Sequence, residues 1–469
     1  MKYNRLTAEH IHHLSAIVGS HHVVLDENNL QRYAHDETDD WQFLPEIVLC
    51  PENTQQVSDI MRYCHAHIIP VTPRGAGTGL SGGALPVCGG VVLATERMNK
   101  ILRIDENNSQ VITQPGVITQ VLQEAVIEKG LYFPPDPASR GSCFIGGNVA
   151  EGSGGPRAVK YGVTKDYVLN LEVVLPSGEI MQTGANVLKN STGYNLTQLI
   201  AGSEGTLGII TQITLRLIPY PPYQLVLLVP FTDAVKACEA VSAVFKAGVT
   251  PSALEFMERD ALEWTLRYCH DVALSLSEQE QAHLLIEVDG FDMDMIRKDA
   301  EKVAEVMDAC GALDVLYAES EDEKNRLWKV RRKVGEAVKS HSVYKEEDTV
   351  VPRFELPHLL KGIKKIGEEY GFHSVCYGHA GDGNLHVNII RGDLDDYQWN
   401  HELPKGIRKI FELCVSLGGT ISGEHGIGWS QKQYMDVVFS TSELALMQRI
   451  KQAFDPNQIL NPGKIFPDK

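Results

Sequence analysis

Two histidines and a glutamate–histidine pair are the residues of this sequence whose types and spacing best suit chemistry. His379 and His386 stand on either side of a Gly-Asp-Gly turn, and Glu424 and His425 lie in a second glycine-rich stretch between apolar segments. Two histidines and one carboxylate form a ligand set typical of a catalytic divalent metal with an open coordination position. A single histidine is more often an ordinary core or surface residue, so the prediction of a metal site depends on both stretches together.

The residues after the turn predict a strand with one polar face. Gly381 and Gly383 disfavour a helix across the turn. Asn384, His386 and Asn388 then alternate with apolar residues, so they share one face of the predicted strand. A buried strand that gives a whole face to such side chains needs a polar partner or ligand opposite it.

A glycine-rich loop from Pro73 to Gly83 is the second chemical signal. Glycines let backbone N–H groups approach a ligand closely and point toward anionic oxygen atoms. The preceding residues predict a helix with Thr54 as its N-cap, followed by a short strand over residues 68–71. Arg74 and Thr78 add polar groups, so a phosphate-binding loop fits this junction better than a merely flexible turn.

Gly77, Gly79 and Gly82 also match the dinucleotide fingerprint of Rossmann folds, but their context does not. That motif requires a helix that opens at the loop. Here Pro86 and two further glycines break any helix, and the chain continues into a predicted strand over residues 91–94. The sequence therefore predicts a phosphate-binding loop of a different fold.

Two more segments of the N-terminal half have the same character. Residues 134–156 combine a proline-rich turn with glycine, asparagine and serine, and residues 202–210 are again rich in glycine. A strand is predicted between them over residues 169–175. Three such loops predict one long, flat ligand that is wrapped by backbone.

Six motifs in chain order give these signals a common origin. They are PRGAGTGLSGG, IGGNVAEGSGG, GSEGTLGIIT, GHAGDGNLHVN, SGEHGIG and DPNQILNPGKIF. Together they resemble the FAD-linked 2-hydroxy acid dehydrogenases of the vanillyl-alcohol oxidase-like flavoprotein superfamily. Within that group the pattern is similar to glycolate dehydrogenase catalytic subunits, D-lactate dehydrogenases and D-2-hydroxyglutarate dehydrogenases.

The resemblance implies an α+β protein in three parts. Residues 1–219 are expected to form a two-part FAD-binding domain of the vanillyl-alcohol oxidase/PCMH type. A proline-rich break follows, and residues 220–420 are expected to form a ferredoxin-like α+β substrate (cap) domain. Residues 421–469 are expected to return to the flavin and complete the active site.

The resemblance also implies which residues bind FAD. No histidine occupies the loop position at which some superfamily members attach the flavin, so non-covalent FAD is expected. The residues expected to contact FAD are Pro73, Arg74, Gly75, Ala76, Gly77, Thr78, Gly79, Gly82, Gly83, Pro135, Asp136, Ile145, Gly146, Gly147, Asn148, Ala150, Glu204, Gly208, Ile210 and Asn461.

The same resemblance assigns the catalytic roles. His379, His386 and Glu424 match the family's metal ligands, with zinc as the expected metal and manganese or iron as alternatives. His425 matches the active-site base, and Asn388 matches a residue of the substrate pocket. This agrees with the chemistry, because a bound metal lowers the pKa of a hydroxyl and a nearby histidine can accept the proton.

Arg331 matches the arginine that binds the substrate carboxylate, and two nearby positions depart from the D-2-hydroxyglutarate pattern. Those enzymes carry a threonine where this chain has Gly335, and a lysine that Lys345 matches only with an offset of one residue. Lys345 is therefore a candidate second anchor, and a dicarboxylate substrate is less expected than a small one.

Composition limits the partners. The 469 residues contain 43 Lys and Arg against 61 Asp and Glu, a net charge of −18, which argues against nucleic acid or an anionic membrane as partner. Nine cysteines without a C-x-x-C motif fit reduced cytoplasmic thiols and no iron–sulfur cluster of the usual spacing. Electrons are therefore expected to pass to a separate acceptor: an electron-transfer flavoprotein, an iron–sulfur subunit or a quinone.

No apolar run of transmembrane length and no signal-peptide core is found, so a cytoplasmic protein is expected, with a homodimer left open. The predicted function is oxidation of a small D-2-hydroxy acid, D-lactate or glycolate. D-2-hydroxyglutarate dehydrogenase is the first alternative. A flavin transferase similar to alkylglycerone-phosphate synthases and a flavin-free metal hydrolase are alternatives from other classes.

Overall fold

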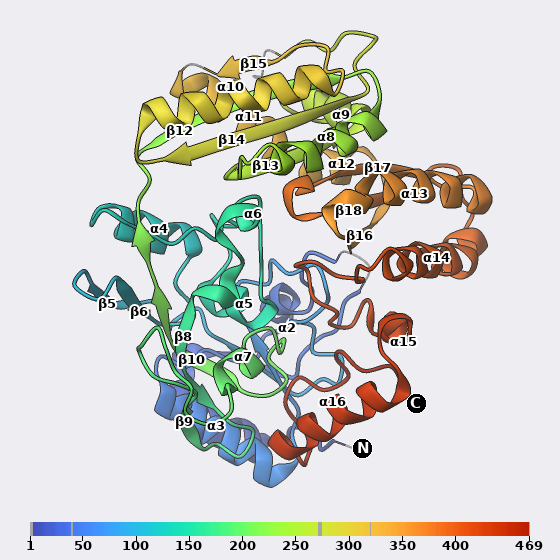
Figure 1. Ribbon diagram of the computed structural model, residues 1–469. Coiled ribbons are helices and arrows are strands. Elements are labelled where there is room, and N and C mark those ends of the chain that lie inside the picture. Colours follow the sequence, from blue (N-terminus) through green and yellow to red (C-terminus); the bar gives the residue numbers. More distant parts are fainter. Residues whose placement is uncertain (1–2, 39–40, 271–273, 319, 469) are drawn as a thin grey trace. The chain divides into compact units, whose positions relative to one another are not determined.

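The computed structural model describes residues 3–38, 41–270, 274–318 and 320–468 (Figure 1). They form two compact units, which are described one at a time. Unit 1 contains residues 1–153, 163–220 and 424–469, and unit 2 contains residues 154–162 and 221–423. Both units combine helices with sheets, so the predicted α+β class is confirmed. Among the described residues, no helix combines the length and the apolarity needed to span a bilayer.

The N-terminal part of unit 1 is a small sheet with strand order β1-β2-β4-β3, in which β2, β4 and β3 run parallel. Apolar residues of α1 and α3 share one buried cluster with these strands. Strands enclosed in this way are expected to be almost entirely apolar, as β4 is. The elements are α1 (Ala8–Val18), β1 (Val23–Val24), α2 (Glu27–Leu30), β2 (Ile47–Leu49), α3 (Thr54–His67), β3 (Val71–Arg74) and β4 (Val91–Ala94).

The predicted helix before the glycine-rich loop is α3, but its N-cap is Asn53 and not Thr54. The Asn53 side chain accepts a hydrogen bond from the backbone N–H of Gln56 at 3.0 Å. Thr54 is the first helical residue, and its hydroxyl donates to Glu172 at 2.6 Å. The strand predicted over residues 68–71 lies three residues further on, as β3, because Ile68 ends α3 in a left-handed conformation with a φ of 52° and the strand begins only at Val71. The loop follows, and the predicted second strand is β4. Because a strand and not a helix follows the loop, the rejection of a Rossmann motif is confirmed.

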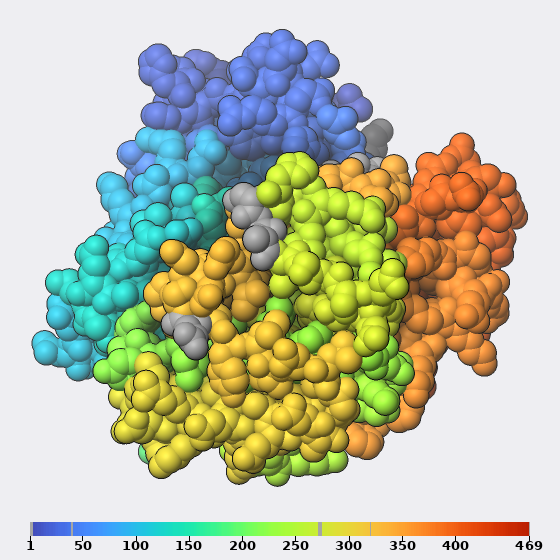
Figure 2. All heavy atoms as spheres, turned by 90° about the horizontal axis from the view of Figure 1, so that it is seen from above, coloured from blue at the N-terminus to red at the C-terminus, as the bar shows by residue number. Residues whose placement is uncertain are grey.

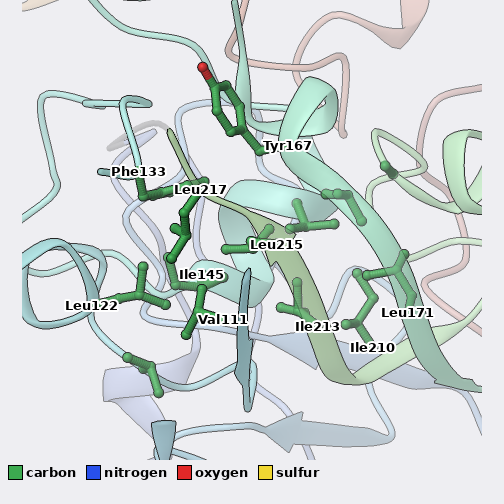
Figure 3. Close-up of a cluster of buried hydrophobic side chains, with 14 of the residues drawn as sticks. Val111, Leu122, Phe133, Ile145, Tyr167, Leu171, Ile210, Ile213, Leu215 and Leu217 are labelled. Carbon is green, nitrogen blue, oxygen red and sulfur yellow. The ribbon is translucent and has the colours of Figure 1, made fainter. Parts of the chain in front are cut away.

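The second sheet of unit 1 is antiparallel, with order β5-β6-β10-β8-β9. Its apolar face packs with α4, α5 and α7 around a core that includes Phe133 and Tyr167 (Figure 3). The elements of unit 1 that follow β4 in the chain are β5 (Ile101–Asp105), β6 (Gln110–Thr113), α4 (Thr119–Ile127), β7 (Leu131–Tyr132), α5 (Ile145–Glu151), β8 (Val168–Val174), β9 (Ile180–Gln182), α7 (Leu196–Ile200), β10 (Ile209–Arg216), β11 (Ile218–Pro219), α15 (Met435–Val438) and α16 (Thr441–Phe454).

One of the three predicted loops is partly helical. Residues 145–151 form α5, with Gly146 and Gly147 in its first turn. A Cβ atom on Gly146 would lie 2.4 Å from Cβ of Pro115, so glycine is needed for the close approach of these two segments. Glycine is a poor helix former, and for this reason the sequence pattern did not predict the helix.

Unit 2 is built on one seven-stranded sheet with order β15-β12-β14-β13-β17-β18-β16. Its first four strands, with α8 and α10, follow the β-α-β-β-α-β order of a ferredoxin-like fold. Helix α10 packs on β12 and β14, and its outer side is exposed (yellow in Figure 2). The strands are β12 (Tyr223–Phe231), β13 (Ala253–Glu258), β14 (Ala282–Gly290), β15 (Leu316–Ala318), β16 (Tyr344–Val350), β17 (His373–Gly378) and β18 (Asn384–Ile390).

The other face of this sheet is covered by α9, α11 and α12, whose apolar residues form one cluster with β12, β13 and β14. Residues 154–162 belong to unit 2 through ion pairs with two buried carboxylates, since Arg157 lies 2.7 Å from Glu287 and Lys160 lies 2.5 Å from Asp289. The helices are α6 (Ala158–Tyr161), α8 (Ala234–Lys246), α9 (Arg259–Tyr268), α10 (Met293–Ala309), α11 (Glu321–Arg332), α12 (Val334–His341), α13 (Leu356–Tyr370) and α14 (Leu403–Ser416).

The strand predicted to carry Asn384, His386 and Asn388 is confirmed as β18. Every one of its residues is buried, and it lies between β17 and β16. The turn before it is a short 3-10 segment, Ala380–Asp382, that ends at Gly383 with a φ of 87°. A left-handed residue there allows the tight return from β17 to β18.

Candidate functional site

The glycine-rich loop after β3 and the first turn of α5 lie against each other in unit 1. A Cβ atom on Gly75 would lie 3.8 Å from Cα of Gly147, an ordinary van der Waals contact, so the two segments are neighbours. A Cβ atom on Gly79 or on Gly147 would meet nothing within 4 Å, although both residues are partly buried. Bare backbone beside open space is the surface that a backbone-bound dinucleotide needs, so these residues fit FAD.

The buried Arg74 side chain stabilises this loop. Its guanidinium lies against Gly77, 5.7 Å from the ring centroid of Tyr33, and donates to the carbonyl of Arg32 at 3.4 Å. Burial lowers the pKa of Arg74. A side chain on Gly77 would displace the guanidinium, so this glycine fixes the shape of the loop.

Several residues expected to contact FAD turn their side chains into the protein. Ile145 and Ile210 are part of the hydrophobic core (Figure 3), so backbone is what they offer to a cofactor. The Asn148 amide donates to the Thr119 hydroxyl at 2.5 Å. Asp136 is buried and lies 3.2 Å from a nitrogen of Arg140. The cradle is therefore mostly backbone, as its glycine content predicts.

The loop that carries His425 is held by the FAD-binding part of unit 1. The Glu204 carboxylate accepts hydrogen bonds from the backbone N–H groups of Ile427 at 2.9 Å and Gly428 at 2.6 Å. The next two N–H groups both donate to the carbonyl of Ser81, at 2.8 and 3.0 Å. Glu204, which the resemblance places among the FAD contacts, thus uses its side chain to position the His425 loop.

Asn461 joins the same segments from the C-terminal end. Its Nδ2 atom donates to the carbonyl of Gly83 at 3.0 Å and to the carbonyl of Glu204 at 2.8 Å. Its φ of 42° is left-handed, which asparagine tolerates better than most residues. The C-terminal segment therefore locks two of the glycine-rich loops together.

A second carboxyl group, that of Glu151, lies beside Glu204. Any Cβ atom on Gly426 would collide with Glu151 Oε2 and lie 3.2 Å from Glu204 Oε1. Burial, and then the charge of Glu204, raise the pKa of Glu151 well above its usual range. Burial also raises the pKa of Glu204, but the two N–H donors oppose that rise. The N–H donors therefore favour the charged form of Glu204 over that of Glu151 within this pair.

In unit 2, one face of the sheet brings together four of the predicted site residues. His379 follows β17, His386 and Asn388 lie on β18, and Arg331 reaches them from α11. The two histidine rings are 5.3 Å apart at an interplanar angle of 84°. The Arg331 guanidinium lies 5.1 Å from the ring centroid of Tyr377 and 3.4 Å from His379 Nδ1.

Asn388 faces this cluster with an unsatisfied amide. The residue is fully buried, and among the described residues neither its nitrogen nor its oxygen has a partner at hydrogen-bond distance and angle, the nearby Tyr377 hydroxyl being the group whose pKa burial raises and the amide lowers. Leaving such a group unpaired costs about 1–3 kcal/mol. A substrate that supplies the missing partner offsets this cost, which agrees with the pocket role that the resemblance implies.

The structure does not bring Lys345 to this face. In the antiparallel pairing of β16 with β18, Lys345 is opposite Ile389, whereas Glu346 is opposite Asn388. Directly paired residues point to the same side of a sheet, so Lys345 lies on the apolar face. There its ammonium is 5.3 Å from the ring centroid of Trp399. The site face instead carries Glu346, 3.5 Å from His386 Nδ1.

Asp348 holds the chain that leads to Glu424. Its carboxylate is fully buried and accepts hydrogen bonds from Asn384 at 2.7 Å, Ser422 at 2.9 Å and the N–H of Gly423 at 2.8 Å. Gly423 is the last residue of unit 2 in this part of the chain, and Glu424 begins the final segment of unit 1. The predicted ligand set thus draws on both units, and it stays a prediction.

Four carboxylates of these sites were not singled out by the sequence analysis: Glu151, Glu255, Glu346 and Asp348. Glu255 is buried on β13 and lies 2.7 Å from Arg331. The sequence signal that could have identified Glu255 is an acidic residue in the middle of an otherwise apolar strand. The signal is weak, because Glu287 on β14 has the same pattern and pairs elsewhere.

Two family models together match most of the chain. A model described as "FAD linked oxidases, C-terminal domain" matches residues 220–465, and one described as "FAD binding domain" matches residues 45–184.

Curated relatives cover nearly the full length. Glycolate oxidase subunit GlcD of Bacillus subtilis is 40% identical over 94% of this chain and 93% of its own. D-lactate dehydrogenase of Anaerostipes hadrus is 38% identical over 99% and 98%. D-2-hydroxyglutarate dehydrogenase of Stutzerimonas stutzeri is 34% identical over 97% and 98%.

Solved structures confirm the type of fold. p-Cresol methylhydroxylase superposes with a TM-score of 0.79 at 17% identity, covering 99% of this chain and 98% of that one. 4-Ethylphenol oxidase from Gulosibacter chungangensis gives 0.78 at 20% identity, covering 100% and 99%. The predicted vanillyl-alcohol oxidase/PCMH type of fold is therefore confirmed.

Proposed function

The chain belongs to the FAD-linked oxidases, as an oxidoreductase of the glycolate, D-lactate and D-2-hydroxyglutarate dehydrogenase type, and on this basis we propose that it oxidises a small D-2-hydroxy acid to the 2-oxo acid. D-lactate and glycolate are the proposed substrates. We propose further that a divalent metal, zinc or else manganese or iron, is bound by His379, His386 and Glu424. The electrons are proposed to leave to a separate flavoprotein, iron–sulfur subunit or quinone.

Each side chain has a role that its chemistry supports. When bound, FAD supplies the hydride acceptor, and the metal supplies the charge that lowers the pKa of the substrate hydroxyl. Arg331 binds the substrate carboxylate and so orients the C2 hydrogen. Asn388 offers its unpaired amide to the substrate, and His425 accepts the hydroxyl proton. The relatives disfavour the transferase and hydrolase alternatives, because those named above, at 34–40% identity, are oxidases and dehydrogenases.

The position of Lys345 is the observation that supports a substrate with one carboxylate over a dicarboxylate. A second carboxylate needs a cation on the face that holds Asn388, and Lys345 points away from it. The residue that does share the face is Glu346, whose charge repels a dicarboxylate. Gly335 has no side chain and so adds no donor, and a Cβ atom there would lie only 3.2 Å from the Tyr377 hydroxyl.

We therefore expect D-lactate or glycolate to give a higher kcat/KM than D-2-hydroxyglutarate. Arg331→Lys is expected to lower kcat/KM for the preferred acid strongly, because lysine cannot form the two-pronged bond to a carboxylate. Steady-state kinetics with a dye acceptor and a panel of D- and L-2-hydroxy acids measures both effects. A preference for D-2-hydroxyglutarate would contradict the proposal and would favour the dicarboxylate alternative.

The flavin is expected to be FAD and to be bound without a covalent link. Purified protein should be yellow, and acid or heat should release intact FAD into the supernatant, because the cradle offers backbone and no attaching histidine. Chromatography of the supernatant against FAD and FMN standards identifies the cofactor. Yellow colour that remains on the precipitated protein would show a covalent bond and overturn this expectation.

A further inference from the structure

Glu255 is a charged residue in the middle of an apolar strand. It lies on β13 between Leu254 and Phe256, and none of its side chain is exposed. Burying a carboxylate is costly unless other groups compensate its charge. Its inward position puts it on the sheet face that α11 covers, which is also the face of His386 and Asn388.

Two groups of the proposed active site provide that compensation. The Glu255 carboxylate lies 2.7 Å from a guanidinium nitrogen of Arg331. It also lies 2.8 and 3.0 Å, through its two oxygen atoms, from Nδ1 of His379. One buried carboxylate therefore binds both the proposed carboxylate-binding arginine and a proposed metal ligand.

These contacts determine the tautomer of His379. A carboxylate only accepts hydrogen bonds, so at 2.8 Å the Nδ1 atom must carry the hydrogen. The guanidinium is only a donor, so its 3.4 Å approach to Nδ1 is proximity within the same cluster. With the hydrogen on Nδ1, the lone pair of the ring is on Nε2, the nitrogen through which His379 would bind a metal.

We propose that Glu255 is a positioning residue that orients His379 for the metal and Arg331 for the substrate carboxylate. The proposal rests on the proposed function and deepens it, since it couples the two binding functions through one side chain. A carboxylate behind a metal-binding histidine keeps the ring orientation fixed and makes it a better ligand.

The same sheet contains a matched control. Glu287 lies on β14 and is also buried on the face that α11 covers. It pairs with Arg157 at 2.7 Å, and it accepts from Trp328 at 2.9 Å and Ser252 at 2.9 Å. These partners lie outside the His379–Arg331 cluster. Glu287→Gln thus removes a buried Glu–Arg pair of the same kind outside the cluster.

The test is a metal titration of stripped, FAD-loaded protein. Wild type, Glu255→Gln, Glu255→Asp and Glu287→Gln are titrated with Zn²⁺, and the visible spectrum of Co²⁺ reports the ligand field. Glu255→Gln is expected to weaken metal binding by about 10- to 100-fold. It should also raise the KM for the 2-hydroxy acid, because Arg331 loses its orienting partner. Flavin content should remain that of wild type, since the FAD cradle is in unit 1.

The outcomes separate the two proposals. Metal binding by Glu255→Gln that equals wild type, or an equal loss in Glu287→Gln, would overturn the role of Glu255 while the proposed function stands. Wild-type protein that binds no metal would overturn both. If Glu255→Gln does not fold, Glu255→Asp decides: its carboxylate is withdrawn by one methylene, so it should weaken binding measurably, and an unchanged affinity would overturn the proposal.

Discussion

Replacing His386 with alanine is expected to abolish oxidation of the 2-hydroxy acid while FAD stays bound. His386 is almost fully buried on β18. Its ring lies beside that of His379, and its Nδ1 atom is 3.5 Å from a carboxylate oxygen of Glu346. If it is a metal ligand, its loss removes the charge that lowers the pKa of the substrate hydroxyl. That contribution is several kcal/mol, which corresponds to roughly three orders of magnitude in rate or more.

The measurement pairs turnover with metal and flavin content of the purified variant. His373→Ala is the control, because His373 lies at the far end of the same hairpin, is exposed and pairs with Asp260 at 2.8 Å. It should retain activity and metal. A His386→Ala protein with near-normal turnover and metal content would show that His386 is not a ligand.

Replacing His425 with alanine is expected to separate proton transfer from metal binding. Turnover should fall by roughly two to four orders of magnitude, the range for loss of a general base. Metal and FAD should both remain, because the proposed ligands are other residues and the loop is held through Glu204 by backbone N–H groups. Those bonds do not involve the imidazole, so the substitution leaves the loop anchored.

The pH profile provides a second readout of the same variant. In wild type, the acidic limb of kcat/KM should report the titration of the base, and this limb should disappear in His425→Ala. His12→Ala, an exposed position on α1, should behave as wild type. Loss of metal from His425→Ala would instead make His425 a ligand, and the base would have to be another residue.

Local sequence patterns were sufficient to predict the elements that neighbouring residues determine. The polar and apolar alternation of residues 384–390 predicts β18 and its polar face, and both are confirmed. The glycines, prolines and strand residues around the Pro73 loop exclude a Rossmann site and predict β4 after it, whereas the strand before it begins three residues later than predicted. Six motifs in order identify the family and its FAD-binding part, and the comparisons confirm both.

Other features depend on which strands become neighbours. Lys345 and Glu346 are adjacent in sequence, and only the register of β16 against β18 decides which of them faces Asn388. A shift of one residue would exchange them, because strand side chains alternate between the two faces. The register is set by contacts far from the motif, so no spacing in the sequence reveals it.

The carboxylates show the same division most clearly. The types of the histidines and the arginine, and the motifs around them, predict that these residues take part in the chemistry. Glu255 is separated from His379 by 124 positions and Glu204 from Ile427 by 223, so neither pairing has a local pattern. Burial makes these long-range contacts necessary, because a carboxylate removed from water must find donors wherever the fold supplies them. The chain by itself therefore determined the family and the cofactor class, whereas only the tertiary structure decided which carboxylates hold the proposed reacting groups in place.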